Sequence, residues 1–177
     1  YPKNWEVWIP FEDDLTEFEL KNKISRKIKN FQITPILRSE YSLLKLEGPI
    51  YIYAQEDITI NGVNFGKNFY LLKDLYGTWT LVQKIEFDDY LAGVLPYEIG
   101  PNSPLEALKA QAVIARTWGI FNSDRFSMDK YHLCITTQCQ VYKPPKITNK
   151  NVKKAIEASS NLILTYRNQP INAFYHG

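Results

Sequence analysis

Glu98 is the residue whose surroundings in the sequence best suit acid–base chemistry. It lies within residues 95–101, where two prolines restrict the backbone and the neighbours Tyr97 and Ile99 are largely apolar. Burial against such neighbours would disfavour the charged carboxylate and raise the pKa of Glu98. A carboxylic acid that donates a proton near neutral pH needs such a shift. The alternative is an ordinary solvated glutamate in a loop.

Arg116 also needs an explanation, because it falls on the apolar face of a predicted helix. The residues at 103–106 are typical of a helix start, with Ser103 as the N-cap and Glu106 placed to complete a capping box. At 100° per residue, one stripe of this helix holds Leu105, Leu108, Ala112 and Ala115. A guanidinium on that stripe is costly unless a carboxylate meets it, and Glu98 in the preceding turn is the obvious candidate. The alternative is that Arg116 extends past the alanines to solvent.

Asp88 and Asp89 are rival acids. They lie in the first turn of a second predicted helix, where a carboxylate is stabilised by the positive end of the helix dipole. Tyr97 and Trp118 are aromatic neighbours of the two candidate residues, and each could stack on a sugar ring or pack in the core.

Cys134 and Cys139 are the only cysteines in the chain, and two interpretations are open. A disulfide is typical of exported proteins and would contribute about 2 kcal/mol for so short a loop. Zinc is the alternative, with His132 as a third ligand and His176 as a fourth if the fold brings it near. Because the spacing does not match a standard zinc finger, we prefer a disulfide or free thiols.

The pattern along the chain predicts an α+β protein with a single domain over residues 1–177. Residues 1–84 form a β-rich lobe, in which Asn61-Gly62 after a β-branched run indicates a hairpin. The expected strands cover residues 5–10, 50–53, 58–60, 69–72 and 78–84. A short helix is expected within 15–29.

Residues 85–177 are expected to hold a helical segment, a cysteine loop and further strands. Phe87, Leu91 and Val94 recur at helical spacing, and the run from 105 to 121 is rich in good helix formers. A third helix is predicted over 151–159. Two C-terminal strands are predicted over 162–166 and 171–175, with a turn between them.

Composition and charge exclude two classes of partner. The formal net charge is +2 and no run of five basic residues occurs, so a nucleic-acid interface is not expected. No stretch of 18 apolar residues is present, so we expect no transmembrane segment in this chain.

Several longer motifs resemble the SpoIID/LytB family, which contains the stage II sporulation protein D and the amidase enhancer. They are FDDYLAGVLPYEI at 87–99, LEALKAQAV at 105–113, ARTW at 115–118, QVY at 140–142, AIEA at 155–158, LILTY at 162–166 and INAFYH at 171–176. The resemblance is close from about residue 80 onward. It implies that Glu98 is the catalytic acid and Arg116 an essential arginine. Tyr97, Gln140, Tyr142 and His176 are then the candidates for substrate binding.

The resemblance implies an exported protein of the cell envelope that acts on peptidoglycan. We expect a lytic transglycosylase that cleaves glycan strands free of stem peptides to 1,6-anhydro-N-acetylmuramic acid ends, with no required cofactor. The alternatives are a non-catalytic, glycan-binding enhancer of an N-acetylmuramoyl-L-alanine amidase and a structural envelope module. Related domains continue beyond the Tyr-His pair, which implies that the domain is incomplete at its C-terminus.

Overall fold

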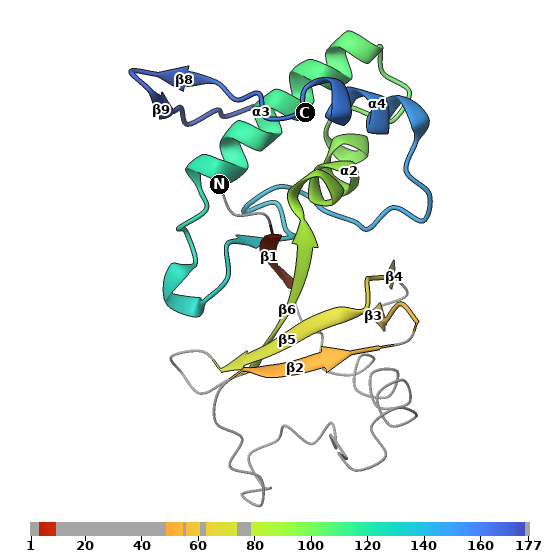
Figure 1. Ribbon diagram of the computed structural model, residues 1–177, viewed down its shortest axis with the longest axis vertical. Helices are drawn as coiled ribbons and strands as arrows, with labels where there is room; N and C mark the ends of the chain where they lie inside the picture. Colours follow the sequence, from red (N-terminus) through yellow and green to blue (C-terminus); the bar gives the residue numbers. More distant parts are fainter. Residues whose placement is uncertain (1–3, 10–48, 55, 61–62, 74–78, 176–177) are drawn as a thin grey trace, which may run out of the picture.

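The computed structural model describes residues 4–9, 49–54, 56–60, 63–73 and 79–175 (Figure 1). The strands are β1 (Asn4–Ile9), β2 (Ile50–Tyr53), β3 (Thr59–Ile60), β4 (Val63–Asn64), β5 (Asn68–Lys73), β6 (Trp79–Glu86), β7 (Leu133–Cys134), β8 (Thr165–Tyr166) and β9 (Gln169–Pro170). The helices are α2 (Phe87–Glu98), α3 (Leu105–Phe121), the short 3-10 helix η1 (Ser127–Asp129) and α4 (Lys150–Ala158). The predicted α+β class is confirmed.

The main sheet contains five strands in the order β2-β5-β6-β1-β7. Neighbouring strands in this sheet are antiparallel, except that β1 and β7 are parallel. β3 and β4 form a separate hairpin, which confirms the predicted pairing around residues 61–62; those two residues lie outside the described ranges. The strands are rich in β-branched and aromatic residues, which fit a pleated, half-buried surface. The helix expected within 15–29 also lies outside the described residues.

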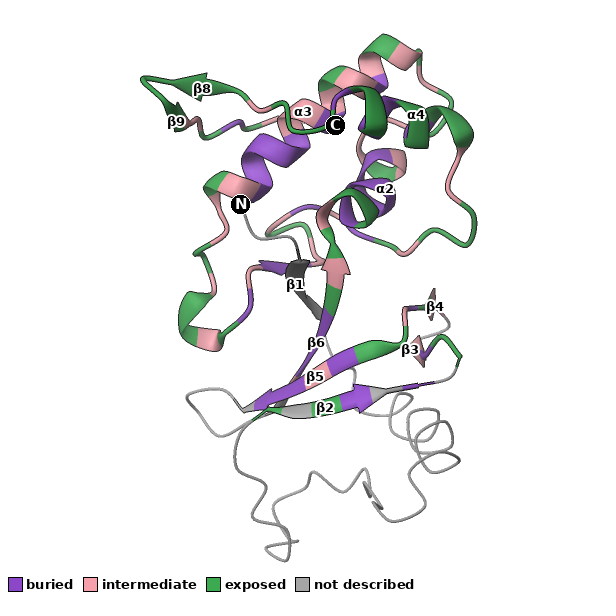
Figure 2. Cartoon of the chain, viewed as in Figure 1, coloured by how far each residue is buried: buried purple, intermediate pink, exposed green. Residues whose placement is uncertain are grey.

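The helices gather above one end of the sheet, and α2 continues directly from β6 (Figure 1). One cluster of buried apolar side chains runs from the sheet into the helices, with Ile52, Phe69 and Leu81 at one end and Leu91 and Leu108 at the other. Figure 2 shows buried segments on α2, on α3 and on the part of β6 that lies beside β5. No helix within the described ranges combines the length and apolar composition that a membrane span requires.

α2 is longer than the sequence indicated. Glu98 was expected in a turn restricted by two prolines, but the helix continues through Pro96 to Glu98. A proline in the last turn removes only one helical hydrogen bond, and the amide of Ile99 still donates to Leu95 O at 3.1 Å. The helix stops because Gly100 adopts a left-handed backbone (φ 88°), the usual conformation just after a helix C-cap.

The start of α3 also differs from the prediction. Ser103 does not cap the helix; Pro104 occupies the N-cap position, and Ser103 Oγ donates to Ile99 O at 2.7 Å. Glu106 pairs with Lys109 Nζ at 2.8 Å and so completes no capping box. Ser103 therefore closes the turn between α2 and α3.

The first C-terminal strand is shorter than predicted, and the prediction of the second over 171–175 is wrong, because the strand lies at Gln169–Pro170, within the expected turn. Only Thr165–Tyr166 and Gln169–Pro170 pair, because Arg167 and Asn168 both adopt positive φ (49° and 63°) and make a two-residue turn. Residues 171–175 are irregular. α4 matches its prediction closely, and Asn149 caps it by accepting from Asn151 N at 2.8 Å.

Candidate active site

Glu98 lies at the C-terminal end of α2, half-buried beside the segment that contains Val141. Burial raises the pKa of its carboxyl group, and a backbone hydrogen bond from Val141 opposes the shift in part. The last turn of a helix carries partial negative charge, which also disfavours a carboxylate there. Glu98 thus has the raised pKa expected of a proton donor, with one backbone donor ready to stabilise its charged form.

A buried hydrogen-bond network joins Tyr90, near the start of α2, to α3 and to the segments that contain Gln140 and Tyr175. Tyr90 OH donates to Gln140 Oε1 at 3.0 Å. The amide nitrogen of Gln140 donates to Tyr175 OH at 2.7 Å and to Ala115 O at 3.3 Å. Burial raises the pKa of both phenols, and the charge of Glu98 adds to the shift in each. Tyr90 and Tyr175 therefore stay protonated and lie close enough to Glu98 to respond to its charge.

The segment from Gln140 to Lys143 is held against α2 by tight packing at Gly93. A Cβ atom at Gly93 would overlap the ring of Tyr142, which stacks on Tyr90 with centroids 5.4 Å apart. Lys143 N donates to Gly93 O at 3.2 Å. Only glycine permits this approach, and the approach fixes the position of the Val141 amide relative to Glu98.

Arg116 is buried on the apolar stripe of α3, as its position predicted, with 4% of its surface exposed. The prediction that it pairs with Glu98 is wrong. Its guanidinium donates to Ser159 O at 2.8 Å and Leu162 O at 3.2 Å, and it pairs with Asp88 at 3.4 Å. Burial lowers the pKa of Arg116 and Asp88 opposes the shift, so the group remains a cation.

Asp88 and Glu98 occupy opposite ends of α2, which explains why Arg116 cannot serve both. Ten residues separate them, roughly 15 Å along the axis at 1.5 Å per residue. Asp88 does lie in the first turn, as expected for a carboxylate that favours the helix dipole. Because Glu98 precedes α3 by only a few residues, a contact between Glu98 and Arg116 was expected. Arg116 lies in the C-terminal half of α3, away from that turn.

The candidates for substrate binding fall into two groups. Tyr97 is 51% exposed next to Glu98, with Lys143 Nζ 5.1 Å from its ring centroid. Gln140 and Tyr142 are buried below that surface, Gln140 with 2% exposed. Trp118 packs in the core. The prediction for His176 falls outside the described residues.

Sequence reasoning missed Tyr90, Tyr175 and the Val141 amide as parts of the site. Tyr90 shares the helical face of Leu91 and Val94, a position typical of a core residue, and the structure places it in the core. Tyr175 lies in a motif of the family resemblance, and that position was its only signal. A backbone amide leaves no trace in a residue pattern.

The sequence profile of the SpoIID family, described as "Stage II sporulation protein", matches residues 76–166, which is more than half of the chain. The chain belongs to the SpoIID family. The matched segment contains Glu98, Arg116 and the whole of α2, α3 and α4.

Three relatives of this SpoIID-family chain differ in how far they match. An uncharacterized protein of Brachyspira hyodysenteriae is 31% identical over 130 residues, covering 71% of this chain and 34% of that protein. The amidase enhancer of Bacillus subtilis is 40% identical over 85 residues, 48% of this chain and 11% of that protein. Stage II sporulation protein D of Bacillus subtilis is 32% identical over 109 residues, which cover 53% of this chain and 32% of that protein. The chain thus spans about a third or less of each relative.

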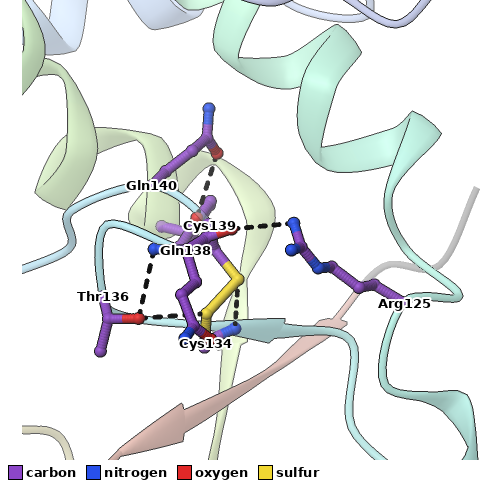
Figure 3. The surroundings of a disulfide bond; sticks show 7 residues. Arg125, Cys134, Thr136, Gln138, Cys139 and Gln140 are labelled. Carbon is purple, nitrogen blue, oxygen red and sulfur yellow. Dashed lines mark hydrogen bonds between the residues drawn. A yellow bond between two sulfur atoms is a disulfide. The ribbon is translucent and has the colours of Figure 1, made fainter.

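Cys134 and Cys139 form a disulfide, with their Cα atoms 5.7 Å apart (Figure 3). The loop between them is ordered by Thr136, whose carbonyl accepts from Cys139 N at 2.9 Å, and by Arg125, which donates to Gln138 O at 2.8 Å. Within the described ranges, no three His, Cys, Asp or Glu side chains are arranged to hold a metal ion. Of the two interpretations of the cysteine pair, the structure shows the disulfide.

The Cys134→Ser/Cys139→Ser double variant is expected to be about 2 kcal/mol less stable than the parent, because the crosslink restricts the unfolded chain. Urea unfolding with and without dithiothreitol measures this. The reductant should destabilise the parent by the same amount and leave the double variant unchanged. A parent that ignores the reductant after full reduction would contradict the prediction.

Proposed function

We propose that this chain carries the catalytic centre of a peptidoglycan lytic transglycosylase, with Glu98 acting as both acid and base. The observation that carries the proposal is the half-buried carboxyl group of Glu98, with its raised pKa, inside the segment that defines the family. The names of the two Bacillus relatives support a role in the cell wall.

The reaction requires one proton donor that later becomes a proton acceptor. Glu98 gives its proton to the glycosidic oxygen that leaves C1 of N-acetylmuramic acid, and the C1–O bond breaks. The C6 hydroxyl of the same sugar attacks C1, and the Glu98 carboxylate takes the hydroxyl proton. The product is a 1,6-anhydro sugar, no water is consumed, and Glu98 ends in its starting protonation state.

The spacing of acids on α2 favours a one-carboxylate route over ordinary hydrolysis. Hydrolytic glycosidases place two carboxyl groups about 5–9.5 Å apart. Asp88 and Asp89, the rival acids, begin the helix that Glu98 ends, roughly 14–15 Å away along its axis. Neither is placed to act as a nucleophile or base for a sugar held at Glu98.

The Val141 amide stabilises the deprotonated form of Glu98, which acts as the base in the second step. When Glu98 is protonated, the backbone hydrogen bond is weak; when Glu98 has lost its proton, the bond is charge-assisted. The packing of Tyr142 on Gly93 holds that amide in place. Tyr97, exposed beside Glu98, offers a ring face for a sugar.

Digestion of peptide-free glycan strands in H₂¹⁸O, followed by mass spectrometry, tests this mechanism. The products should carry 1,6-anhydro-N-acetylmuramic acid ends without ¹⁸O. A hydrolytic muramidase run in parallel should give reducing ends that carry ¹⁸O. Reducing ends with ¹⁸O from this chain would exclude the transglycosylase reaction.

The 40% identity to the amidase enhancer over 85 residues supports a second candidate function, a glycan-binding partner of a cell-wall amidase. Under that proposal Glu98 has no role in turnover, and a Glu98→Gln variant stimulates the amidase as well as the parent does. Both candidates place the chain in the cell envelope, where an oxidising environment would favour the disulfide.

A further inference from the structure

A concave region lies away from Glu98, between the sheet and the N-terminal half of α2. It is a cavity of about 830 Å³, bounded by β2, β4, β5 and β6, by Asp89 and Ala92 of α2, and by the loop from Tyr142 to Thr148. This volume falls within the range of sites that hold small ligands. Neither Glu98 nor Arg116 lines it.

We infer that this cavity is a distal saccharide subsite, which holds acetamido sugars of the same glycan strand whose bond is cut at Glu98. The inference rests on the proposed function. It assigns substrate contacts to the β-rich half of the chain, to which the family motifs assign none.

The rim of the cavity presents aromatic rings to solvent. Tyr51 is 71% exposed on β2 and meets Tyr70 of β5 edge to face, with ring centroids 4.7 Å apart. An exposed, fixed tyrosine pair offers apolar area with a hydroxyl at its edge, which suits the C–H face of a pyranose ring. Large exposed aromatics on a cavity rim are more informative than isolated ones elsewhere on a surface.

The wall of the cavity holds an acceptor that lacks a donor. Gln83 is buried, with 4% exposed, and its Oε1 has no hydrogen-bond partner among the residues that the structure describes. Gly66 makes room for this amide, since a Cβ there would lie 2.5 Å from Gln83 Nε2. Buried acceptors are rarely left unpaired. Because this oxygen has almost no accessible surface, a sugar N–H or hydroxyl would pair with it only after the Gln83 side chain turns toward the cavity.

The charge of the lining favours a nearly neutral ligand. Three carboxylates (Asp57, Glu86 and Asp89) and two lysines (Lys67 and Lys84) contribute. Such a balance gives no strong field for a polyanion or a polycation. A peptide-free strand carries one lactyl carboxylate on alternate sugars, which is a low charge density, and Lys67 and Lys84 are the lining residues that would meet such a carboxylate.

The cavity and Glu98 are joined by the same two segments. Asp89 and Glu98 lie nine residues apart on α2, roughly 14 Å along the helix axis, a length that several consecutive sugars of one strand span. Val141 bonds Glu98, and the next residue, Tyr142, lines the cavity. Residues 90–95 of α2 are buried between the two sites, so one strand would pass from Glu98 over Tyr97 and the exposed loop residues Lys143 and Pro145 to the cavity.

Calorimetric titration tests the subsite with peptide-free glycan strands fractionated by length, in a Glu98→Gln background that prevents cleavage. Tyr51→Ala should weaken binding of long strands by roughly five- to tenfold and leave two-disaccharide strands unaffected. The matched control is Tyr166→Ala, an equally exposed tyrosine on β8, which should bind like the background.

Thr148→Trp is a second variant, since it fills the cavity from the loop side without removing a core side chain. It should also abolish the gain in affinity with strand length, while its thermal midpoint stays at that of the background. Long-strand affinity equal to the control in both variants would overturn the inference, as would equal losses on short and long strands or a preference for a polyanion such as teichoic acid. Turnover by the chain with intact Glu98, measured separately, reports on the proposed function alone.

Discussion

Replacing Glu98 with glutamine is expected to lower the rate of glycan cleavage by about 10²–10⁴-fold, the usual contribution of a general acid or base. Glutamine keeps the size of the side chain and retains an oxygen that accepts from the Val141 amide. It cannot release or take a proton. The fold should therefore survive, and the loss should appear in turnover rather than in binding of the strand.

The matched control for this variant is Glu106→Gln, the same change in the first turn of α3. Glu106 is exposed and its partner, Lys109, lies on the same helix, so the substitution should leave the rate near that of the parent. Cleavage is followed by release of anhydro-ended fragments from peptide-free strands. A Glu98→Gln variant that cleaves as fast as Glu106→Gln would contradict the catalytic assignment.

The pH profile gives an independent check on the same residue. Because burial raises the pKa of Glu98, the protonated acid persists above the usual range for a glutamate. The reaction starts from the protonated form, so activity should fall as pH rises through that raised pKa. The falling limb should be missing from the residual activity of Glu98→Gln.

The sequence predicted the elements of this protein better than their ends. Hydrophobic periodicity located α2, α3 and α4, and the apolar stripe on α3 correctly placed Arg116 in the interior. The end of α2 and the N-cap of α3 were predicted wrongly from Pro96 and Ser103, because contacts within the folded protein determine the conformation of the turn between these helices. Pro96 is tolerated in a last turn, and Ser103 bonds Ile99 instead of capping.

Parts of the site could not be predicted because they depend on long-range contacts. Asp88 and Arg116 lie 28 residues apart, and Tyr90 and Gln140 lie 50 apart. Residue types suggested that Arg116 needs a partner but not which acid would reach it. Gln140 was a candidate for substrate binding because it lies in a motif of the family resemblance, yet its amide is used within the protein. Its role as a substrate contact stays a prediction.

Replacing Arg116 with alanine is expected to destabilise the protein by about 2–5 kcal/mol, because one buried and one partly buried carbonyl lose a charged donor. These are Ser159 O, at the end of α4, and Leu162 O, at the start of the segment that leads into β8. In the same stretch, Leu164 N donates to Thr117 Oγ1 of α3 at 2.9 Å. Arg116 therefore ties α4 and the C-terminal hairpin to α3.

The Asp88→Asn variant separates the contribution of the ion pair from that of the hydrogen bonds that Arg116 donates to Ser159 O and Leu162 O. Asp88 is half exposed and 3.4 Å from the guanidinium, so its loss of charge should cost no more than about 1 kcal/mol. Arg116→Lys should fall between the two, since an ammonium group lacks the planar fork that reaches both carbonyls. Urea unfolding should show a loss of stability that increases in the order Asp88→Asn, Arg116→Lys, Arg116→Ala.

If Asp88→Asn destabilised the protein as much as Arg116→Ala, the ion pair would be the stabilising element. If Arg116→Ala kept full stability but lost turnover, Arg116 would act on the substrate directly. The expected order instead makes Arg116 a positioning residue, whose effect on catalysis passes through the hairpin segment that ends near Tyr175.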